Sequence, residues 1–164
     1  MDEENIYRPD DSYFLEQSIL LAFQGMRLNV GGPFGAIIVQ QGVITGRGCN
    51  QVVAGNDPTA HAEIVAIRQA CRKVGAFHLQ EAVLYSSCEP CPMCLAAAYW
   101  AGVERIVYGM GKEEAARMGF GDREIYREMI VHPAERMIPG IQMRHPLLVS
   151  LQAEWEGKKD KVMY

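Results

Sequence analysis

Two short segments decide the fold and chemistry of this chain: His61-Ala62-Glu63 and, further along, Pro90-Cys91-Pro92-Met93-Cys94. Together they form the pattern H-x-E…P-C-x-x-C. One imidazole and two thiolates make a ligand set that holds zinc and leaves its fourth position open for water. The metal lowers the pKa of that water to about 7, so hydroxide is available at neutral pH. The pattern therefore predicts one catalytic zinc ion (Zn2+) per chain, with His61, Cys91 and Cys94 as ligands and Glu63 as the free carboxylate that moves protons.

Both segments are expected where helices begin. Apolar residues at helical spacing predict a helix over 60–74, which places His61 and Glu63 in its first turn. Two prolines flank Cys91 at the start of a second helix over 91–101, since proline is well tolerated at the first helical position. The partial positive charges of two helix N-termini would then meet at the metal and favour thiolate over thiol.

The rest of the chain predicts strands alternating with helices, which implies βαβ units with right-handed crossovers. Strands are expected over 34–39, 43–48, 82–87 and 103–108. Helices are expected over 12–28, with Ser12 as N-cap, and over 112–118 and 124–130, and a loop over 50–57. Residues 147–151 fit either a last strand or the start of a terminal helix.

Length and charge limit the class of protein. At 164 residues, with 49% hydrophobic and 22% charged residues, the chain fits a single domain spanning 1–164. The net charge of −4 argues against nucleic acid as a partner, because phosphate contacts require a positive surface. The acidic start has no signal-peptide apolar region, and the longest mostly apolar stretch, 92–103, is too short to cross a bilayer. With a thiolate-ligated metal, these features favour a cytoplasmic protein without a membrane partner.

The remaining cysteines leave alternatives open. Cys88, Cys91 and Cys94 are equally spaced, a pattern that can begin an iron–sulfur site. Cys88 could also complete a closed Cys3His structural zinc site, which would leave Glu63 without a role. A disulfide is less favoured, because the count of 5 cysteines is odd. We expect Cys88 to end a strand without touching the metal, and Cys49 and Cys71 to be small buried apolar residues.

The motif set resembles that of a known family. H-x-E…P-C-x-x-C is the signature of zinc-dependent nucleobase deaminases. The matching stretches continue through 31–36 (GGPFGA), 56–63 (NDPTAHAE), 87–94 (SCEPCPMC) and 119–122 (GFGD), and end at Tyr164. Over 12–164 the chain resembles bacterial guanine deaminases of the cytidine deaminase superfamily. The GFxD segment and the terminal tyrosine point to guanine, and the chain departs from the family at Gly121, where a second acidic residue is expected.

This resemblance implies a fold, a reaction and an assembly. The fold is α/β: a three-layer α/β/α sandwich around a five-stranded mixed sheet. The reaction converts the small-molecule nucleobase guanine to xanthine and ammonia through attack of zinc hydroxide at C2. The assembly is a homodimer in which the C-terminal segment 145–164 is exchanged between subunits.

The resemblance also implies a substrate pocket, in which Glu63 is the proton shuttle beside the zinc. Its members are the aromatic walls Phe34 and Trp100, the amide of Asn50, the backbone of Ala62, the carboxylate of Asp122, and Tyr164 of the partner. Each has an ordinary alternative. An asparagine satisfies loops, aromatic residues fill cores, an aspartate after glycine caps a helix, and a chain end frays.

Other functions share parts of the pattern. A tRNA adenosine deaminase has the same metal motif but needs a basic tail, and here Lys158, Lys159 and Lys161 are largely offset by neighbouring acids. Deaminases of guanosine, a triazine or another nucleobase are closer alternatives. A non-catalytic zinc-binding scaffold is the alternative from outside enzymes, and it has no use for Glu63.

Overall fold

The computed structural model describes residue 8 and residues 10–163. The chain divides into two compact units, Met1–Asp122 and Arg123–Tyr164. The first contains all the strands of the described chain and the two helices that carry the metal motif. In the described part of the chain, no helix is both long and apolar enough to span a membrane.

The first unit is built on a mixed sheet of four strands in the order β2-β1-β3-β4. The strands are β1 (Gly35–Gln40), β2 (Val43–Cys49), β3 (Ala82–Cys88) and β4 (Arg105–Met110). β1 pairs antiparallel with β2 and β3, whereas β3 and β4 are parallel. The implied count of five strands is therefore not observed among the described residues. Residues 147–151, one candidate for a further strand, lie in α7 (Pro146–Gly157), where Pro146 opens the helix.

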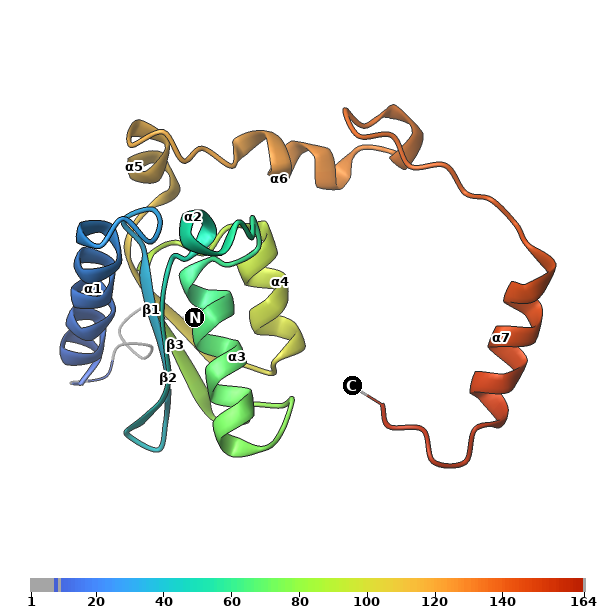
Figure 1. The fold of residues 1–164 in the computed structure, drawn as a ribbon, viewed down its shortest axis with the longest axis horizontal. Coiled ribbons are helices and arrows are strands. Elements are labelled where there is room, and N and C mark those ends of the chain that lie inside the picture. Colours follow the sequence, from blue (N-terminus) through green and yellow to red (C-terminus); the bar gives the residue numbers. More distant parts are fainter. Residues whose placement is uncertain (1–7, 9, 164) are drawn as a thin grey trace. The chain divides into compact units, whose positions relative to one another are not determined.

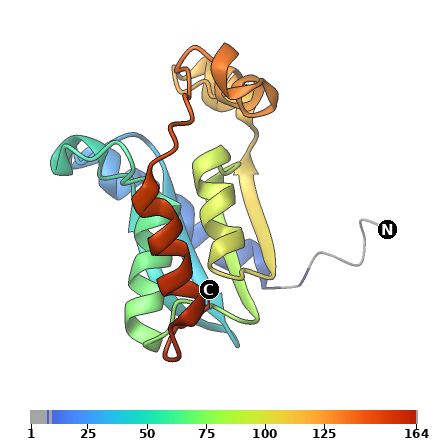
Figure 2. The same ribbon diagram turned by 90° about the vertical axis from the view of Figure 1, so that its right-hand side faces the viewer.

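Helices cover both faces of this sheet, which confirms the three layers (Figures 1 and 2). Helix α1 (Asp11–Arg27) packs on one face over a core that includes Phe14, Ile37, Val39, Val83 and Tyr85. Helices α3 (Ala62–Val74) and α4 (Pro92–Trp100) pack on the other, over Ala36, Ile38, Ala66, Ile67, Leu84 and Ala98. Alternate residues of β1 thus point into two cores, as the continuous apolar run predicted.

Two glycines of β2 set how closely α3 approaches the sheet. A Cβ added at Gly46 would collide with the carbonyl oxygen of Ala66, and one at Gly48 with that of Ala62. Only a residue without a side chain therefore allows this contact. Because Ala62 follows His61 directly, the glycines of β2 help to place the metal-binding turn of α3.

The start of α1 differs from the prediction. The N-cap is Asp10, not Ser12, and the next residue, Asp11, is 1% exposed. Both Arg105 nitrogens Nη1 and Nη2 donate to the Asp11 carboxylate at 2.8 and 2.7 Å, and the Tyr85 hydroxyl donates at 2.6 Å. These hydrogen bonds, Arg105 first, hold the pKa of Asp11 well below its usual range. The buried pair ties α1 to β3 and β4.

The segment predicted as a loop over 50–57 contains the short helix α2 (Val52–Gly55). The prediction missed it because a single turn carries no periodic signal. Asn50 Oδ1 accepts from the Val52 N–H at 3.2 Å, which satisfies one donor of that turn. Asn56 ends the helix with a left-handed φ of 46°, a conformation that asparagine tolerates.

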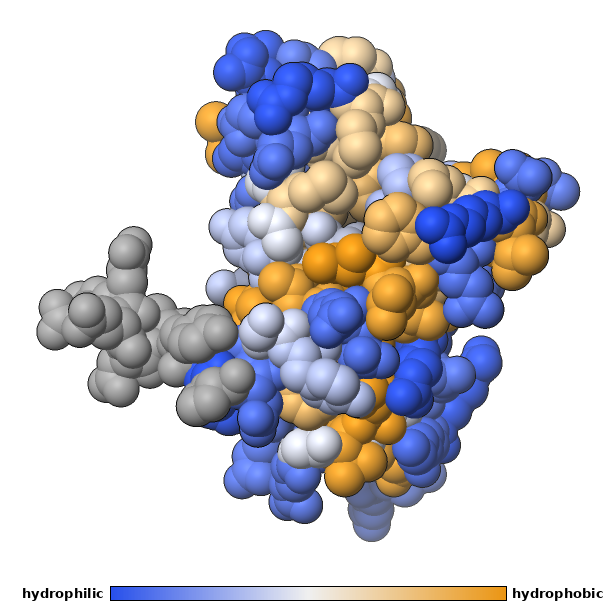
Figure 3. Space-filling view, turned by 90° about the vertical axis from the view of Figure 1, so that its left-hand side faces the viewer, coloured by the Kyte–Doolittle hydropathy of each residue, from blue (hydrophilic) through white to orange (hydrophobic). Residues whose placement is uncertain are grey.

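One surface of the first unit is apolar without carrying the metal motif. A cavity of about 370 Å³ has walls that are almost entirely apolar, lined by Ile19, Ala22, Phe23, Met26, Pro33, Ser87, Gly109 and Met110. Figure 3 shows apolar side chains gathered on the side of the molecule that carries α1. The lining contains none of the three motif ligands, so this cavity is not the candidate active site.

The second unit consists of helices and connecting loops. Helix α6 (Arg123–Ile130) is followed by the 3-10 turn η2 (Pro133–Glu135) and by α7. No residue described in this unit is buried. The prediction of a helix near 124–130 is confirmed, and the alternative of a terminal helix is the correct one for 147–151.

Candidate active site

The three motif ligands lie where two helices begin. His61 is the N-cap of α3 and Cys91 the N-cap of α4, both in extended backbone conformation. Their carbonyl oxygens accept the first helical hydrogen bonds, from the N–H groups of Val65 at 3.0 Å and Leu95 at 2.9 Å. Cys94 lies in the first turn of α4. The predicted meeting of two helix N-termini is therefore observed.

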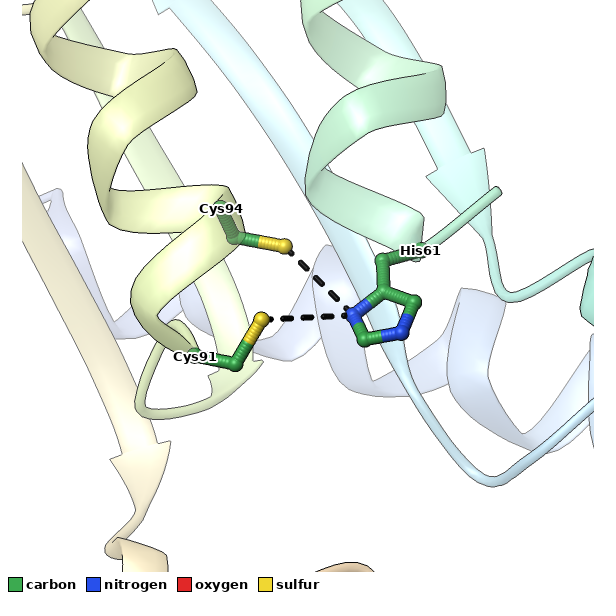
Figure 4. Close-up of side chains that lie close together, drawn as sticks. All are labelled: His61, Cys91 and Cys94. Atoms are coloured by element: carbon green, nitrogen blue, oxygen red, sulfur yellow. Dashed lines mark hydrogen bonds between the residues drawn. The ribbon is translucent and has the colours of Figure 1, made fainter. Parts of the chain in front are cut away.

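The ligand atoms converge on one point (Figure 4). His61 Nδ1 lies 3.5 Å from both Cys91 Sγ and Cys94 Sγ, and all three atoms lie within 4.8 Å of one another. Tetrahedral zinc with bonds of about 2.3 Å to sulfur and about 2.0 Å to nitrogen separates these atom types by about 3.5 Å. The spacing therefore fits a zinc ion bound through Nδ1 of the histidine.

The charges of the two thiols support the same conclusion. Hydrogen bonds from Cys94 and His61 lower the pKa of Cys91 to about 4. The same sulfur–sulfur contact, together with burial, raises the pKa of Cys94. One thiolate therefore opposes ionisation of the other, and a dication is the species that stabilises both. One imidazole and two thiolates are therefore a donor set that suits a zinc ion.

Glu63 lies beside the ligands in a buried position. Its Oε1 accepts from the Ser86 hydroxyl at 3.0 Å, and its Oε2 lies 3.4 Å from Cys94 Sγ. Burial raises the pKa of this carboxyl group, so it holds a proton more readily than an exposed glutamate. A buried carboxyl that is oriented by a hydroxyl and adjacent to a metal site suits a proton shuttle.

Cys88 ends β3, as predicted, and does not join the group. Its Sγ contacts the Gly111 carbonyl oxygen at 4.0 Å. Burial, followed by the charge of Glu63, raises the pKa of this thiol to about 11. Among the described residues the candidate metal group contains His61, Cys91 and Cys94, which favours an open site over a closed one. All 5 cysteines are free, and Cys49 and Cys71 are partly exposed instead of buried as predicted.

Asn50 is held in its loop by backbone donors. It is 6% exposed, and its Oδ1 accepts from the N–H groups of Gly32 and Val52, each at 3.2 Å. Its Nδ2 group is the part of the amide that these bonds leave as a donor. Oδ1 of Asn50 therefore satisfies the loop, whereas the predicted hydrogen bond to the base would use Nδ2. Ala62 is fully buried in the first turn of α3, where the helix itself leaves backbone N–H groups unpaired.

Phe34 and Asp122 lie on two loops of the first unit. Phe34 is half-buried, and its ring lies edge-on to Phe120 with centroids 4.9 Å apart and planes at 87°. Asp122 is also half-buried. Burial raises the pKa of its carboxyl group, and the charges of Cys91 and Glu89 raise it further. Gly121, the departure from the family pattern, has room for a side chain, since an added Cβ would lie 3.7 Å from Ala116 Cβ.

Comparison with known proteins gives the family. The family model described as cytidine and deoxycytidylate deaminase zinc-binding region matches residues 8–110. The chain belongs to this deaminase family. The predicted resemblance is thereby confirmed, and the two segments H-x-E and P-C-x-x-C both fall inside the matched range.

The relatives of this deaminase cover most of its length. Guanine deaminase of Bacillus subtilis (strain 168) is 44% identical over 151 residues, which is 92% of this chain and 97% of that protein. Its crystal structure superposes with a TM-score of 0.89 at 42% identity, covering 100% of this chain and 99% of that one. The tRNA-specific adenosine deaminase of Buchnera aphidicola subsp. Schizaphis graminum (strain Sg) is 36% identical over 110 residues, 67% of this chain and 72% of that protein. The structure of NE0047 in complex with 2,6-diaminopurine has a TM-score of 0.66 at 29% identity, covering 68% of this chain and 62% of that one.

One predicted pocket residue, Trp100, lies away from the metal group in the described chain of the deaminase. Trp100 is the last residue of α4 and is 65% exposed. It follows Cys91 by nine positions, which is about 13 Å along a helix. Tyr164 lies outside the described residues. The roles of both stay predictions.

The structure adds residues that the sequence analysis missed. Ser86, the partner of Glu63, lies in an otherwise apolar buried strand. Such a hydroxyl needs a hydrogen-bond partner, so its position was a usable signal. Ser87 accepts from the Gly35 N–H at 3.0 Å and holds the start of β1 beside Phe34. Phe120 lies in the GFGD segment, but nothing in its spacing indicated that it contacts Phe34.

Proposed function

We propose that this chain is a guanine deaminase, which hydrolyses guanine to xanthine and ammonia. The observation that carries the proposal is the open group of His61, Cys91 and Cys94 with buried Glu63 beside it. It occurs in a chain 44% identical to the guanine deaminase of Bacillus subtilis over 92% of its length. A structural zinc site has no use for the buried carboxylate.

The reaction needs a nucleophile and proton transfers. A zinc ion held by the three ligands would supply an activated water at neutral pH. Glu63 accepts one proton of the attacking water as the C2–O bond forms and passes it to ring N3. It then moves the second water proton to the amino nitrogen, so that the C2–N bond breaks, the C2 carbonyl forms and ammonia leaves. Ser86 keeps the carboxylate oriented through Oε1, while Oε2 faces the ligand side near Cys94. The balance is one water consumed and one ammonia released.

Base recognition uses the residues around this centre. The Nδ2 of Asn50 can donate to an acceptor on the purine, because Oδ1 is already engaged by backbone donors. The Phe34 ring offers an apolar face for stacking. The carboxylate of Asp122 can accept from purine N–H groups. Guanine presents both an acceptor edge and N–H groups, so it suits this set.

The assembly proposed is a homodimer with exchange of 145–164. Helix α7 exposes Leu147, Leu148, Val149 and Leu151. Apolar surfaces of this size on helices indicate a missing partner. Tyr164 of one subunit would then close the pocket of the other and exclude water. The five free cysteines fit a reducing compartment, and we place the enzyme in the cytoplasm.

Ammonia release from a panel of substrates tests the function. Zinc-loaded protein is supplied with guanine, guanosine, adenine, cytosine, a triazine and a tRNA anticodon stem-loop. Guanine is expected to give the highest kcat/KM, with xanthine as the identified product. Preferential release from the stem-loop would support a tRNA adenosine deaminase instead. Turnover of none of them by protein with one zinc per chain would favour the scaffold.

A further inference from the structure

The loop that carries Asp122 is held at its start by the end of α5 (Lys112–Arg117). Gly119 has a left-handed φ of 93°, which glycine adopts without strain. The Gly119 and Phe120 N–H groups donate to the carbonyl oxygens of Ala116 and Ala115, both at 3.0 Å. This is the Schellman arrangement, and it determines the backbone as far as Phe120. Asp122 follows two residues later.

The side chain of Phe120 is engaged with the pocket wall. In a Schellman end, the residue at this position frequently packs on its own helix. Here the ring meets Phe34 edge-to-face at 4.9 Å between centroids, although Phe120 is 47% exposed overall. A Cβ added at Gly32 would lie 3.1 Å from both rings. The pair therefore rests on Gly32, whose N–H donates to Asn50.

The beginning of α5 is tied to the metal side of the site. The Lys112 N–H donates to Glu89 Oε2 at 3.2 Å, and the Gly111 N–H donates to Glu114 Oε2 at 2.8 Å. Glu89 lies two residues before Cys91. The segment from Gly111 to Phe120 is thus attached at both ends to loops that form the site, and Asp122 is the next acidic residue beyond the second attachment.

We propose that Phe120 is a positioning residue: by packing on Phe34 it holds the loop 119–122 against the pocket, so that the Asp122 carboxylate meets the purine edge. This rests on the proposed function, because Asp122 is the group through which Phe120 acts. Asp122 lies two residues beyond Phe120, so the contact between the Phe120 and Phe34 rings restricts where the loop can place its carboxylate. Phe120 also extends the apolar wall beside the base.

A double-mutant cycle in zinc-loaded protein tests the inference. The variants are Phe120→Ala, Asp122→Asn and the two combined, measured by kcat and KM for guanine and by equilibrium binding of 8-azaguanine. Phe120→Ala is expected to lower kcat/KM about tenfold, near the upper value of an aromatic pair, with zinc content unchanged. The combined variant is expected to have nearly the same kcat/KM as Asp122→Asn alone. The reason is that Asp122→Asn already removes the carboxylate that Phe120 positions. Phe120→Leu, which keeps apolar contact, should recover part of the activity.

The matched control is Phe77→Ala. Phe77 is 48% exposed and also contacts a ring, that of His78, but it follows the C-terminal end of α3, whereas His61 precedes the start of that helix. Wild-type kcat/KM is expected for the control. Multiplicative losses in the combined variant, or wild-type activity in Phe120→Ala, would overturn the inference and leave the proposed function standing. Failure of the wild-type protein to deaminate guanine would overturn the proposed function itself.

Discussion

Helices α3 and α7 have similar lengths, 13 and 12 residues, but opposite surroundings. Ala66, Ile67 and Ala70 of α3 are at most 8% exposed against the sheet. In α7, Leu147, Leu148, Val149 and Leu151 are all at least 51% exposed. Both sequences form a helix, but in the described structure only α3 has buried its apolar side chains.

This difference shows which part of the chain is self-sufficient. Helices of about 12–15 residues or fewer are marginal in water without tertiary packing. Helix α3 obtains that packing inside its own unit and can hold His61 rigidly. The apolar side chains of helix α7 are exposed in the described structure, and the proposed exchange between subunits would bury them. Mutations at the metal centre and changes to segment 145–164 should therefore have different effects on zinc content and activity.

The largest effect is expected from the metal ligands of the self-sufficient unit. Cys91→Ser should remove most of the bound zinc and with it the activity, because a hydroxyl is a poor replacement for a thiolate. Cys88→Ser is the matched control three residues away and should keep one zinc per chain. Elemental analysis of both purified variants measures this. Equal zinc loss in the two would indicate a closed four-ligand site.

Glu63→Gln should keep zinc and the fold but lose activity by about 10²–10⁴-fold, because an amide cannot accept the proton. Glu104→Gln is the control, an exposed glutamate paired with Arg8 at 3.4 Å, and should retain wild-type kcat. Steady-state ammonia release measures both variants. Wild-type turnover by Glu63→Gln would refute the proton-shuttle role.

Removal of residues 145–164 should lower kcat/KM for guanine on the order of 10²-fold, the cost of a poorly closed and poorly positioned site. Zinc content and unfolding of the first unit should change little, because that unit contains its own cores. Sedimentation should show a loss of dimer. Exchange is tested by refolding the truncated chains with Glu63→Gln chains: recovered activity supports it, and no recovery in verified mixed dimers contradicts it.

The remaining predictions concern ion pairs, change stability instead of activity and end with the smallest effect. Arg105→Met leaves the buried Asp11 carboxylate unpaired and should cost about 3–5 kcal/mol. Arg127→Ala breaks the exposed Arg127–Glu124 pair of α6, 2.8 Å in length, and should cost about 0.3–0.5 kcal/mol. Urea unfolding of both variants at neutral pH gives the comparison. Similar costs for both would mean that the buried pair does not stabilise the first unit.

The Asp11–Arg105 pair also predicts how the stability of the protein depends on pH. The pKa of Asp11 is lowered in the folded protein, so its contribution is present above the unfolded value of about 3.9 and is lost as the pH falls toward the folded pKa. Wild-type stability should therefore fall more steeply below about pH 4 than that of Arg105→Met. Parallel curves for the two proteins would contradict this assignment.

Much of the first unit was predictable because its signals are local. The apolar runs that became β1 and β3 and the helical spacing of α3 each match their structural period. The Asp11–Arg105 pair was not predictable, since its members are 94 residues apart and neither has a local partner pattern. The short α2 was missed because a single turn carries no periodic signal. The four strands of the sheet are the four that the apolar pattern predicted, whereas the fifth was implied only by the resemblance.

The sequence by itself determined the ligand types, the free glutamate and the helices that carry them, because H-x-E and P-C-x-x-C place these groups within one turn of a helix start. Only the tertiary structure decided that His61 Nδ1 lies 3.5 Å from both thiols, that Ser86 orients Glu63 and that Phe120 meets Phe34. The physical reason is that these contacts join separate elements, and their distances follow from how the glycines of β2 and the two cores pack the layers together.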